Sequence, residues 1–259
     1  GTNVGAILAP LVVPLIAVKW GWQWAFILTG AVGFIWLIFW FIMYEVPAKH
    51  KKLSNSEFEY INSDIEGKIS RDENVIEGPK ISWVKLLGYK QTWAFFIGKF
   101  MTDPIWWFFL FWLPAFLNAE YNLVGTQVSI PLAVVYTMTT FGSIFGGWLP
   151  MHFIKKGWAV PKARKTSMLI YAFFPLPVLF SQELGQHGMW YAVIIIGIAA
   201  SAHQAWSANI FTTVSDMFPK RAVSSVTGIG GMAGAIGGML IAKLAGALLD
   251  HYKTLGNIK

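Results

Sequence analysis

The chain has 259 residues, of which 55% are hydrophobic and 16% aromatic, whereas only 13% are charged, with a formal net charge of +7. A soluble domain carries about a quarter charged residues, so a water-soluble fold could not bury this much apolar surface. The absence of cysteine excludes disulfides and thiolate metal sites. The basic residues lie between apolar runs rather than on one face, which argues against a nucleic-acid-binding protein.

Apolar runs, scanned with a window of about twenty residues, predict an all-α polytopic membrane protein with about seven transmembrane helices. The first run is short and begins abruptly at Gly1, without a methionine or a basic leader. We therefore interpret the chain as a fragment that starts inside or beside a helix. The expected spans are residues 4–18, 24–44, 93–116, 129–153, 166–180, 189–214 and 223–249.

The loops between these spans differ in charge. Most lysines and arginines fall in segment 45–90, in the loop 154–165, or at Lys220 and Arg221. Lys19 is the only lysine or arginine in the alternate loops of the sequence. Because basic loops stay on the cytoplasmic side of a membrane, the central loop is expected to be cytoplasmic.

The central loop contains one local motif. Ser54 and Glu57 have the spacing of a capping box, and Phe58, Ile61 and Ile65 then share one helical face. The pattern predicts a short amphipathic helix at the membrane surface. Its simplest interpretation is a solvated linker helix with no role in substrate binding.

Small residues and prolines mark three of the spans. Pro175 and Pro177 predict a broken helix in the fifth span. The fourth span has Gly142 and Gly146 on one face. Such stripes let helices approach closely, so packing is the expected role and gating the alternative. The last span repeats the pattern at Gly230, Gly234, Gly238, Ala242 and Gly246.

The third span carries ionisable residues inside an apolar run. Lys99 and Asp103 are four residues apart and thus share a helical face, and Pro104 follows the acid. A charge in this position is costly unless it is paired or faces water, which makes Asp103 a candidate functional residue. The alternative is a pair that only fixes the helix, or a lysine that reaches the headgroups.

The sixth span is the most polar. His203 and Ser207, and Trp206 with Asn209, have helical spacings that would present a polar and aromatic face to a sugar-like ligand. A single buried histidine is as often only hydrogen-bonded as functional. No nucleophilic triad, phosphate loop or metal-ligand cluster is present, which argues against a membrane-embedded enzyme.

These motifs, in order, carry a family resemblance over essentially the whole chain. The sequence resembles the major facilitator superfamily in its anion:cation symporter branch, and most of all bacterial hexuronate transporters, as helices five to eleven of twelve. The segments that carry the resemblance read NVGAILAP, WQWAFILTGAVGFIWLIFW, LSNSEFEYI, KFMTDPIWWFFLFWLP and AHQAWSANIFTTVSDMFPKRAVSSVTGIGGMAG.

The resemblance implies a proton-coupled importer of sugar acids such as galacturonate or glucuronate, working by alternating access in the bacterial inner membrane. It implies no enzymatic activity and no cofactor; the partners are the sugar acid, protons and lipid, and the protein is expected to be monomeric. Residues 1–46 would be the last two helices of the N-terminal bundle, residues 47–90 the cytoplasmic central loop, and residues 91–259 five helices of the C-terminal bundle.

The resemblance also implies roles for individual residues. Proton coupling is expected at Asp103 and His203, and packing or gating at Gly230, Gly234 and Gly238, with Gly231 beside them. The residues expected to bind substrate are Thr2, Asn3, Lys99, Trp107, His203, Gln204, Trp206 and Asn209.

One segment departs from the superfamily pattern. Residues 155–165 lie where the superfamily has a charged cytoplasmic gate, yet the sequence PMHFIKKGWAVPKARK contains no acidic residue. A gating salt bridge is therefore not expected from this segment alone.

Two alternative functions stay open. Transport of another organic anion, such as an aldonate, a monocarboxylate or phosphate, is the nearer one. A seven-helix retinal photoreceptor would use Lys243 with a carboxylate of the third span, but Lys243 lies near the end of its helix.

Overall fold

A computed structural model describes residues 2–47, 49–50, 52–62 and 81–254, with the side chains of residues 2, 3, 62, 253 and 254 left out. The described residues form helices and no strands. The α-helices are α1 (Thr2–Trp20), α2 (Trp22–Met43), α3 (Asn55–Asn62), α4 (Trp83–Leu87), α5 (Lys90–Tyr121), α6 (Ser129–Lys155), α7 (Val160–Phe173), α8 (Ser181–Gly185), α9 (Met189–Met217) and α10 (Lys220–Thr254).

The expected all-α membrane architecture is confirmed. Six helical segments in the described part of the chain are long and apolar enough to cross a membrane, and Val4–Trp20 forms a shorter apolar helix. Each of the seven spans expected from the sequence therefore corresponds to an apolar helical segment. The first is short, as its sequence predicted.

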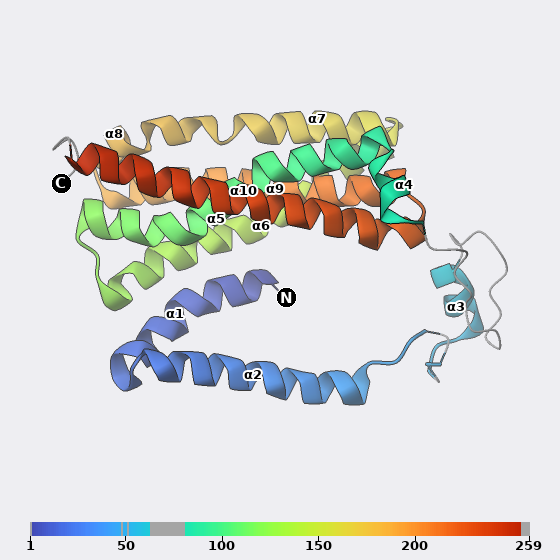
Figure 1. Cartoon of the computed structure of the whole chain (residues 1–259), viewed down its shortest axis with the longest axis horizontal. Coiled ribbons are helices and arrows are strands. Elements are labelled where there is room, and N and C mark those ends of the chain that lie inside the picture. The colour runs from blue at the N-terminus through green and yellow to red at the C-terminus, as the bar shows by residue number, and fades with distance from the viewer. Residues whose placement is uncertain (1, 48, 51, 63–80, 255–259) are drawn as a thin grey trace.

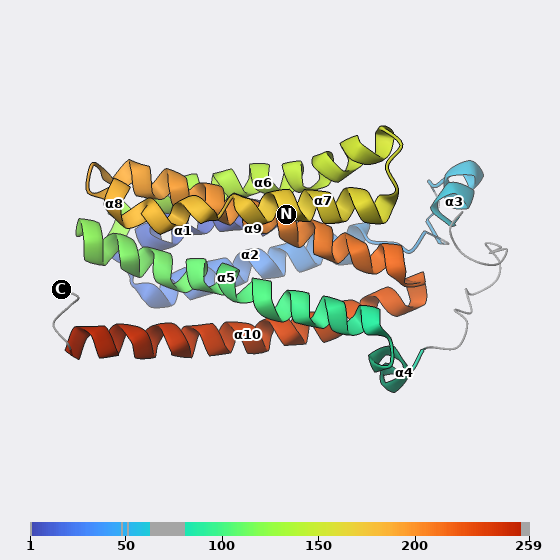
Figure 2. The same cartoon turned by 90° about the horizontal axis from the view of Figure 1, so that it is seen from above.

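The helices form one packed group with an appended pair. Helix α5 packs along α10, α6 packs along α9, and α7 lies against both α6 and α9 (Figure 2). Helix α1 contacts α6, and α2 contacts α1. In Figure 1 the α1–α2 pair lies to one side of the other long helices. Among the side chains of α2, Ala25 is buried, and the helix otherwise presents apolar residues outward.

The basic loops gather at one end of the molecule. Helices α3 and α4, the α6–α7 connection and the α9–α10 connection lie at the right-hand end in Figure 1. The α1–α2 turn and α8 lie at the opposite end. The alternation of charge along the sequence thus matches an alternation in space.

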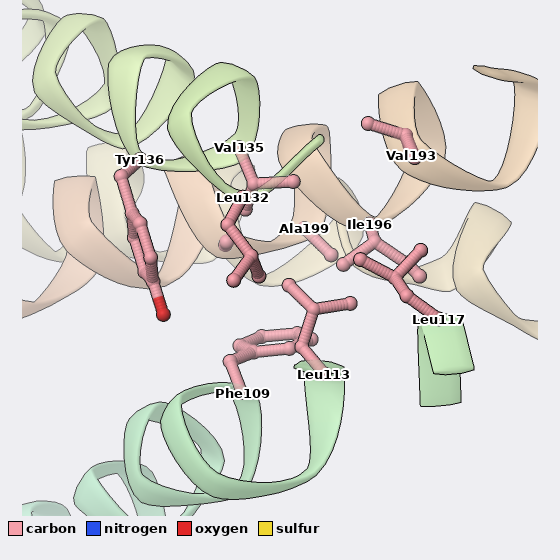
Figure 3. Packing of buried hydrophobic residues seen from close by; sticks show 10 residues of the cluster. Phe109, Leu113, Leu117, Leu132, Val135, Tyr136, Val193, Ile196 and Ala199 are labelled. Carbon is pink, nitrogen blue, oxygen red and sulfur yellow. The ribbon is translucent and has the colours of Figure 1, made fainter. Parts of the chain in front are cut away.

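Two apolar clusters hold the C-terminal helices together. Figure 3 shows the first, in which Phe109 and Leu113 of α5 meet α6 and α9. The second joins Leu86 of α4 and Phe95 of α5 to α9 and α10. On α5, the polar segment that contains Lys99 and Asp103 lies between the two clusters. The full set of buried members is Phe109, Leu113, Leu117, Leu132, Val135, Tyr136, Val193, Ile196, Ala199 and Ala200 in the first cluster, and Leu86, Phe95, Ile210, Val214, Ala222, Val226 and Ile229 in the second.

The glycine stripes lie at helix contacts. A Cβ atom added at Gly230, Gly234 or Gly238 of α10 would overlap a side chain of α5. On α6, a Cβ at Gly146 would lie 2.7 Å from the Cα of Ala205 in α9. The stripes therefore let α10 approach α5, and α6 approach α9, at close range.

The predicted capping box begins α3. The Ser54 Oγ accepts from the Glu57 N–H at 3.2 Å, and the Ser54 N–H donates to Glu57 Oε2 at 3.1 Å. Hydrogen bonds from the Ser54 backbone and then its hydroxyl hold the pKa of Glu57 below its ordinary value. Phe58 is buried and Ile61 exposed, whereas Ile65 lies outside the described residues.

The fifth span is broken at its prolines, as predicted. Helix α7 ends at Phe173, and a 3₁₀ turn, Leu176–Phe180, leads into α8. Proline lacks the N–H that would continue the helix. Helix α4 was not predicted because its five residues are too short to show periodicity, although Ser82 caps it by accepting from the Lys85 N–H.

Candidate functional site

An ion pair lies within α5. The Lys99 Nζ is 2.7 Å from Asp103 Oδ1, and the exposed fractions of the two side chains are 4% and 19%. The ammonium also lies 4.0 Å from the centroid of the Phe211 ring of α9, a favourable cation–π distance. Because a buried charge is costly unless it is paired, each member of this pair depends on the other.

Helix α10 makes room for the carboxylate. A Cβ at Gly234 would overlap the Asp103 carboxyl group, whereas a Cβ at Gly231 would meet no atom within 4 Å. Gly234, which has no side chain, therefore faces the acid. Asp103 lies between its own helix and α10, and 19% of its side chain stays exposed.

His203 reaches the same region from α9. Its Nε2 is 2.9 Å from the carbonyl oxygen of Thr102, the residue before Asp103. A carbonyl only accepts, so Nε2 carries the hydrogen and the neutral ring keeps Nδ1 as an acceptor. Nδ1 is buried and has no hydrogen-bond partner among the described residues. The ring stacks on Trp106, with centroids 6.0 Å apart and planes inclined by 10°.

The structure brings together Lys99, Asp103 and His203 from the predicted set. Asn209 faces α6 instead: its Nδ2 donates to the carbonyls of Gly146 at 2.7 Å and Ala205 at 2.9 Å, which leaves only its Oδ1 as an acceptor. Trp206 packs on the cluster that includes Phe95 and Ile210. The sequence placed Trp206 and Asn209 on one face, and the structure turns them toward different helices.

The other predicted binding residues lie further out. Gln204 is partly buried, and its side chain makes no hydrogen bond with described residues. Trp107 faces Gly238 and stacks on Phe111 with a centroid distance of 5.9 Å, so it lies away from His203. Thr2 and Asn3 belong to α1, but their side chains lie outside the described set.

Two ring contacts near the pair involve residues that were not among those predicted to bind substrate. Trp106, and not Trp107, stacks on His203. Both tryptophans are within one turn of Asp103, so spacing alone could not separate them. Phe211, which lies under the lysine, was detectable because it is two turns beyond His203 on the same face of α9.

A second ion pair lies at the basic end of the molecule. Arg164 of α7 donates two hydrogen bonds to the carboxylate of Asp216 in α9. Its Nε donates to Oδ2, and its Nη2 donates to Oδ1 at 3.3 Å. Segment 155–165 contains no acid, as its sequence shows, and its Arg164 takes its acidic partner from another helix. The pair links α7 to the end of α9.

Arg164→Gln and Asp216→Asn are each expected to lower the free energy of unfolding by about 1 kcal/mol or less, because the side chains are partly exposed. Exchanging the charges, with Arg164→Asp and Asp216→Arg together, is expected to recover most of that loss. Thermal unfolding of the purified variants at low and high salt measures both effects. A charge-exchanged protein no more stable than the single variants would contradict the pairing.

The bundle of apolar helices with an ion pair buried inside it defines a multi-pass membrane protein with charge in its interior. A family model described as Major Facilitator Superfamily matches residues 1–242. The chain belongs to this superfamily.

Three named relatives show which transporters the chain is similar to. The chain is 30% identical to the hexuronate transporter of Escherichia coli strain K12 over 96% of this chain and 57% of the relative. It is 26% identical to the D-galactonate transporter of Escherichia coli O6:H1 over 97% of this chain and 59% of the relative. The galacturonate transporter of Dickeya chrysanthemi is 30% identical over 60% of this chain and 44% of the relative. The chain thus spans less than two thirds of the length of these relatives, and their names point to a transporter rather than an enzyme.

Proposed function

We propose that the chain is part of a proton-coupled symporter that imports hexuronates or related sugar acids by alternating access. The three relatives are named for hexuronate, galacturonate and D-galactonate, which are hydroxylated carboxylates. The observation that carries the proposal is the buried Lys99–Asp103 pair, because it places a cation for a carboxylate beside a group able to carry a proton.

The pair supplies a mechanism for coupling. While Asp103 is ionised, it neutralises Lys99 at 2.7 Å. When Asp103 takes up a proton, the ammonium of Lys99 loses its counter-charge and becomes a site for the substrate carboxylate. Release of the proton on the other side of the membrane restores the internal pair and displaces the anion. Proton and anion thus bind together, and neither alone leaves the interior neutral.

The rest of the predicted site would recognise the sugar. The Nδ1 of His203 is an unused acceptor for a hydroxyl group, and its ring completes the coupling region beside Asp103. Gln204 and the Oδ1 of Asn209 offer further hydrogen bonds, and Trp107 and Trp206 offer apolar faces to the sugar ring. Thr2 and Asn3 of α1 would contribute from the opposite bundle.

The proposed arrangement in the membrane follows the charges. The end that gathers the basic loops faces the cytoplasm of a bacterial cell, and the protein lies in the inner membrane as a monomer. Residues 1–46 end the N-terminal bundle, residues 47–90 form the central loop and residues 91–259 belong to the C-terminal bundle. The glycines at 230, 234 and 238 let α10 slide on α5 during the transition.

Uptake of labelled galacturonate and glucuronate by the full-length protein in proteoliposomes tests this function. We expect accumulation of at least one of them against its gradient when an inward proton gradient is imposed, and loss of accumulation when a protonophore collapses it. Uptake that ignores the proton gradient would contradict proton coupling. Absence of uptake of both acids, beside uptake of another organic anion, would contradict the substrate class.

Transport of an aldonate is the second candidate. It is favoured by the similarity to a D-galactonate transporter over nearly the whole chain. Competition of unlabelled D-galactonate with labelled galacturonate separates the two, because the preferred acid competes at the lower concentration. A retinal photoreceptor is set aside, since the chain belongs to the superfamily and Asp103 pairs with Lys99.

A further inference from the structure

A groove of about 540 Å³ lies between α6, α7 and α9, away from the Lys99–Asp103 pair. Helices α6 and α7, which pack against each other, run side by side along one edge of the molecule in Figure 2. The walls on α6 are aromatic and more than half exposed, as at Phe141, Phe145 and Trp148. The lining residues are Met138, Phe141, Gly142, Phe145, Trp148, Leu149, Ile170, Tyr171, Phe174, Ile198, Ser201, Ala202 and Ala205.

The two hydroxyl groups in the lining are already satisfied. The Tyr171 hydroxyl donates to the Phe145 carbonyl at 2.7 Å, and the Ser201 hydroxyl donates to the Gly197 carbonyl at 2.7 Å. Apart from the indole N–H of Trp148, the lining therefore offers a ligand no side-chain hydrogen-bond donor that is not already in use. A single N–H would not compensate a sugar acid for the hydration it loses there, whereas a hydrocarbon chain would lose none.

The face of α6 that lines the groove continues to the basic end of the helix. Phe141, Phe145, Trp148, His152 and Lys155 follow one another at spacings of three or four residues, so they share one face. The rings of Trp148 and His152 stack with centroids 5.2 Å apart. An apolar groove thus leads, along a single helix face, to an imidazole and then to an ammonium group.

Positive charge collects where that face ends. Residues 151–169 include no acid, and Arg164 of this segment is paired with Asp216. Lys155, Lys156 and Lys165 have no ion-pair partner in the described part of the chain. Lys162 lies 4.8 Å from the centroid of the Trp158 ring, and that ring stacks on Phe153 at 4.7 Å.

The separation between groove and charge suits a lipid. Lys156, the residue after α6 ends, follows Leu149 by seven positions, a rise of about 10 Å. A phospholipid has its phosphate at the interface and its acyl chains directly beneath it. Basic pockets between membrane helices at the cytoplasmic side bind anionic headgroups, and tryptophans favour the same depth.

We propose that this groove binds one anionic phospholipid, with an acyl chain between α6 and α7 and the phosphate against Lys155, Lys156 and Lys162. The apolar lining selects a chain rather than a sugar, and the lysines select an anionic headgroup over a zwitterionic one. The site is separate from the proposed transport site and does not depend on the transported substrate.

Native mass spectrometry of the full-length protein, titrated with phosphatidylglycerol or with phosphatidylcholine of identical acyl chains, tests the proposal. We expect one phosphatidylglycerol to bind at least several-fold more tightly than phosphatidylcholine. The exposed pair Lys155→Gln with Lys156→Gln is expected to weaken that binding roughly tenfold, because each lysine near an anionic headgroup contributes to affinity. Lys243→Gln, near the other end of the molecule, is the matched control and is expected to leave it unchanged.

A second pair of variants tests the groove itself. Ile170→Trp places bulk in the lining, whereas Leu169→Trp adds the same ring at a neighbouring exposed position outside it. We expect only Ile170→Trp to weaken phosphatidylglycerol binding, and we expect glycerol phosphate, which has no acyl chain, not to bind. Equal binding of the two lipids, or no effect of the lysine variant, overturns the proposal even if Ile170→Trp fails to fold. Binding of glycerol phosphate as tightly as the lipid overturns the role of the groove.

Discussion

Asp103→Asn is expected to abolish proton-driven accumulation of sugar acid. Asparagine keeps the shape of the side chain but neither carries a negative charge nor exchanges a proton, so Lys99 loses its counter-ion permanently. Removing one member of a buried ion pair costs roughly 3–5 kcal/mol, and the variant is therefore also expected to be less stable. Uptake and counterflow in proteoliposomes, with and without a proton gradient, measure the transport effect, and thermal unfolding measures the stability effect.

The double variant Lys99→Gln with Asp103→Asn separates coupling from folding. It removes both charges, so it should recover most of the lost stability while accumulation stays absent. Glu120→Gln, an exposed acid on the same helix, is the matched control and should accumulate substrate like the original protein. Normal gradient-driven accumulation by Asp103→Asn would remove Asp103 from the coupling mechanism and leave the pair a purely structural role.

The features that the sequence predicted well depend on local patterns. The spans followed from runs of apolar residues, and the cap of α3 followed from the spacing of Ser54 and Glu57. The Lys99–Asp103 pair was equally accessible, because residues four apart on a helix always share a face. The spans depend on composition alone, and the cap and the ion pair join residues three or four apart, so no tertiary information was needed.

The features that the sequence could not predict depend on contacts between distant segments. The acid that pairs with Arg164 lies 52 residues away, so no inspection of the loop could reveal it. The choice between Trp106 and Trp107 depends on how α5 is rotated against α9. The glycine stripe of α10 indicated a close helix contact, but only the packed structure shows that Gly234 faces Asp103.

Gly146→Ala and Gly147→Ala are expected to have opposite effects, although the two residues are adjacent on α6. A Cβ at Gly146 would lie 2.7 Å from the Cα and from the carbonyl oxygen of Ala205, and backbone atoms cannot move aside as a flexible side chain can. The substitution would push α6 from α9 and stretch the 2.7 Å hydrogen bond from Asn209 to the Gly146 carbonyl.

Overpacking of this kind costs about 1–3 kcal/mol, so we expect Gly146→Ala to unfold several degrees below the original protein in detergent. A Cβ at Gly147 would meet no atom within 4 Å, and alanine is the better helix former by about 1 kcal/mol. Gly147→Ala should therefore unfold at the same or a slightly higher temperature. Equal unfolding temperatures for both variants would mean that α6 and α9 tolerate a methyl group between them. Because His203 is on α9 and its Nε2 donates to α5, a displaced α9 should also weaken substrate uptake, and Gly147→Ala should not.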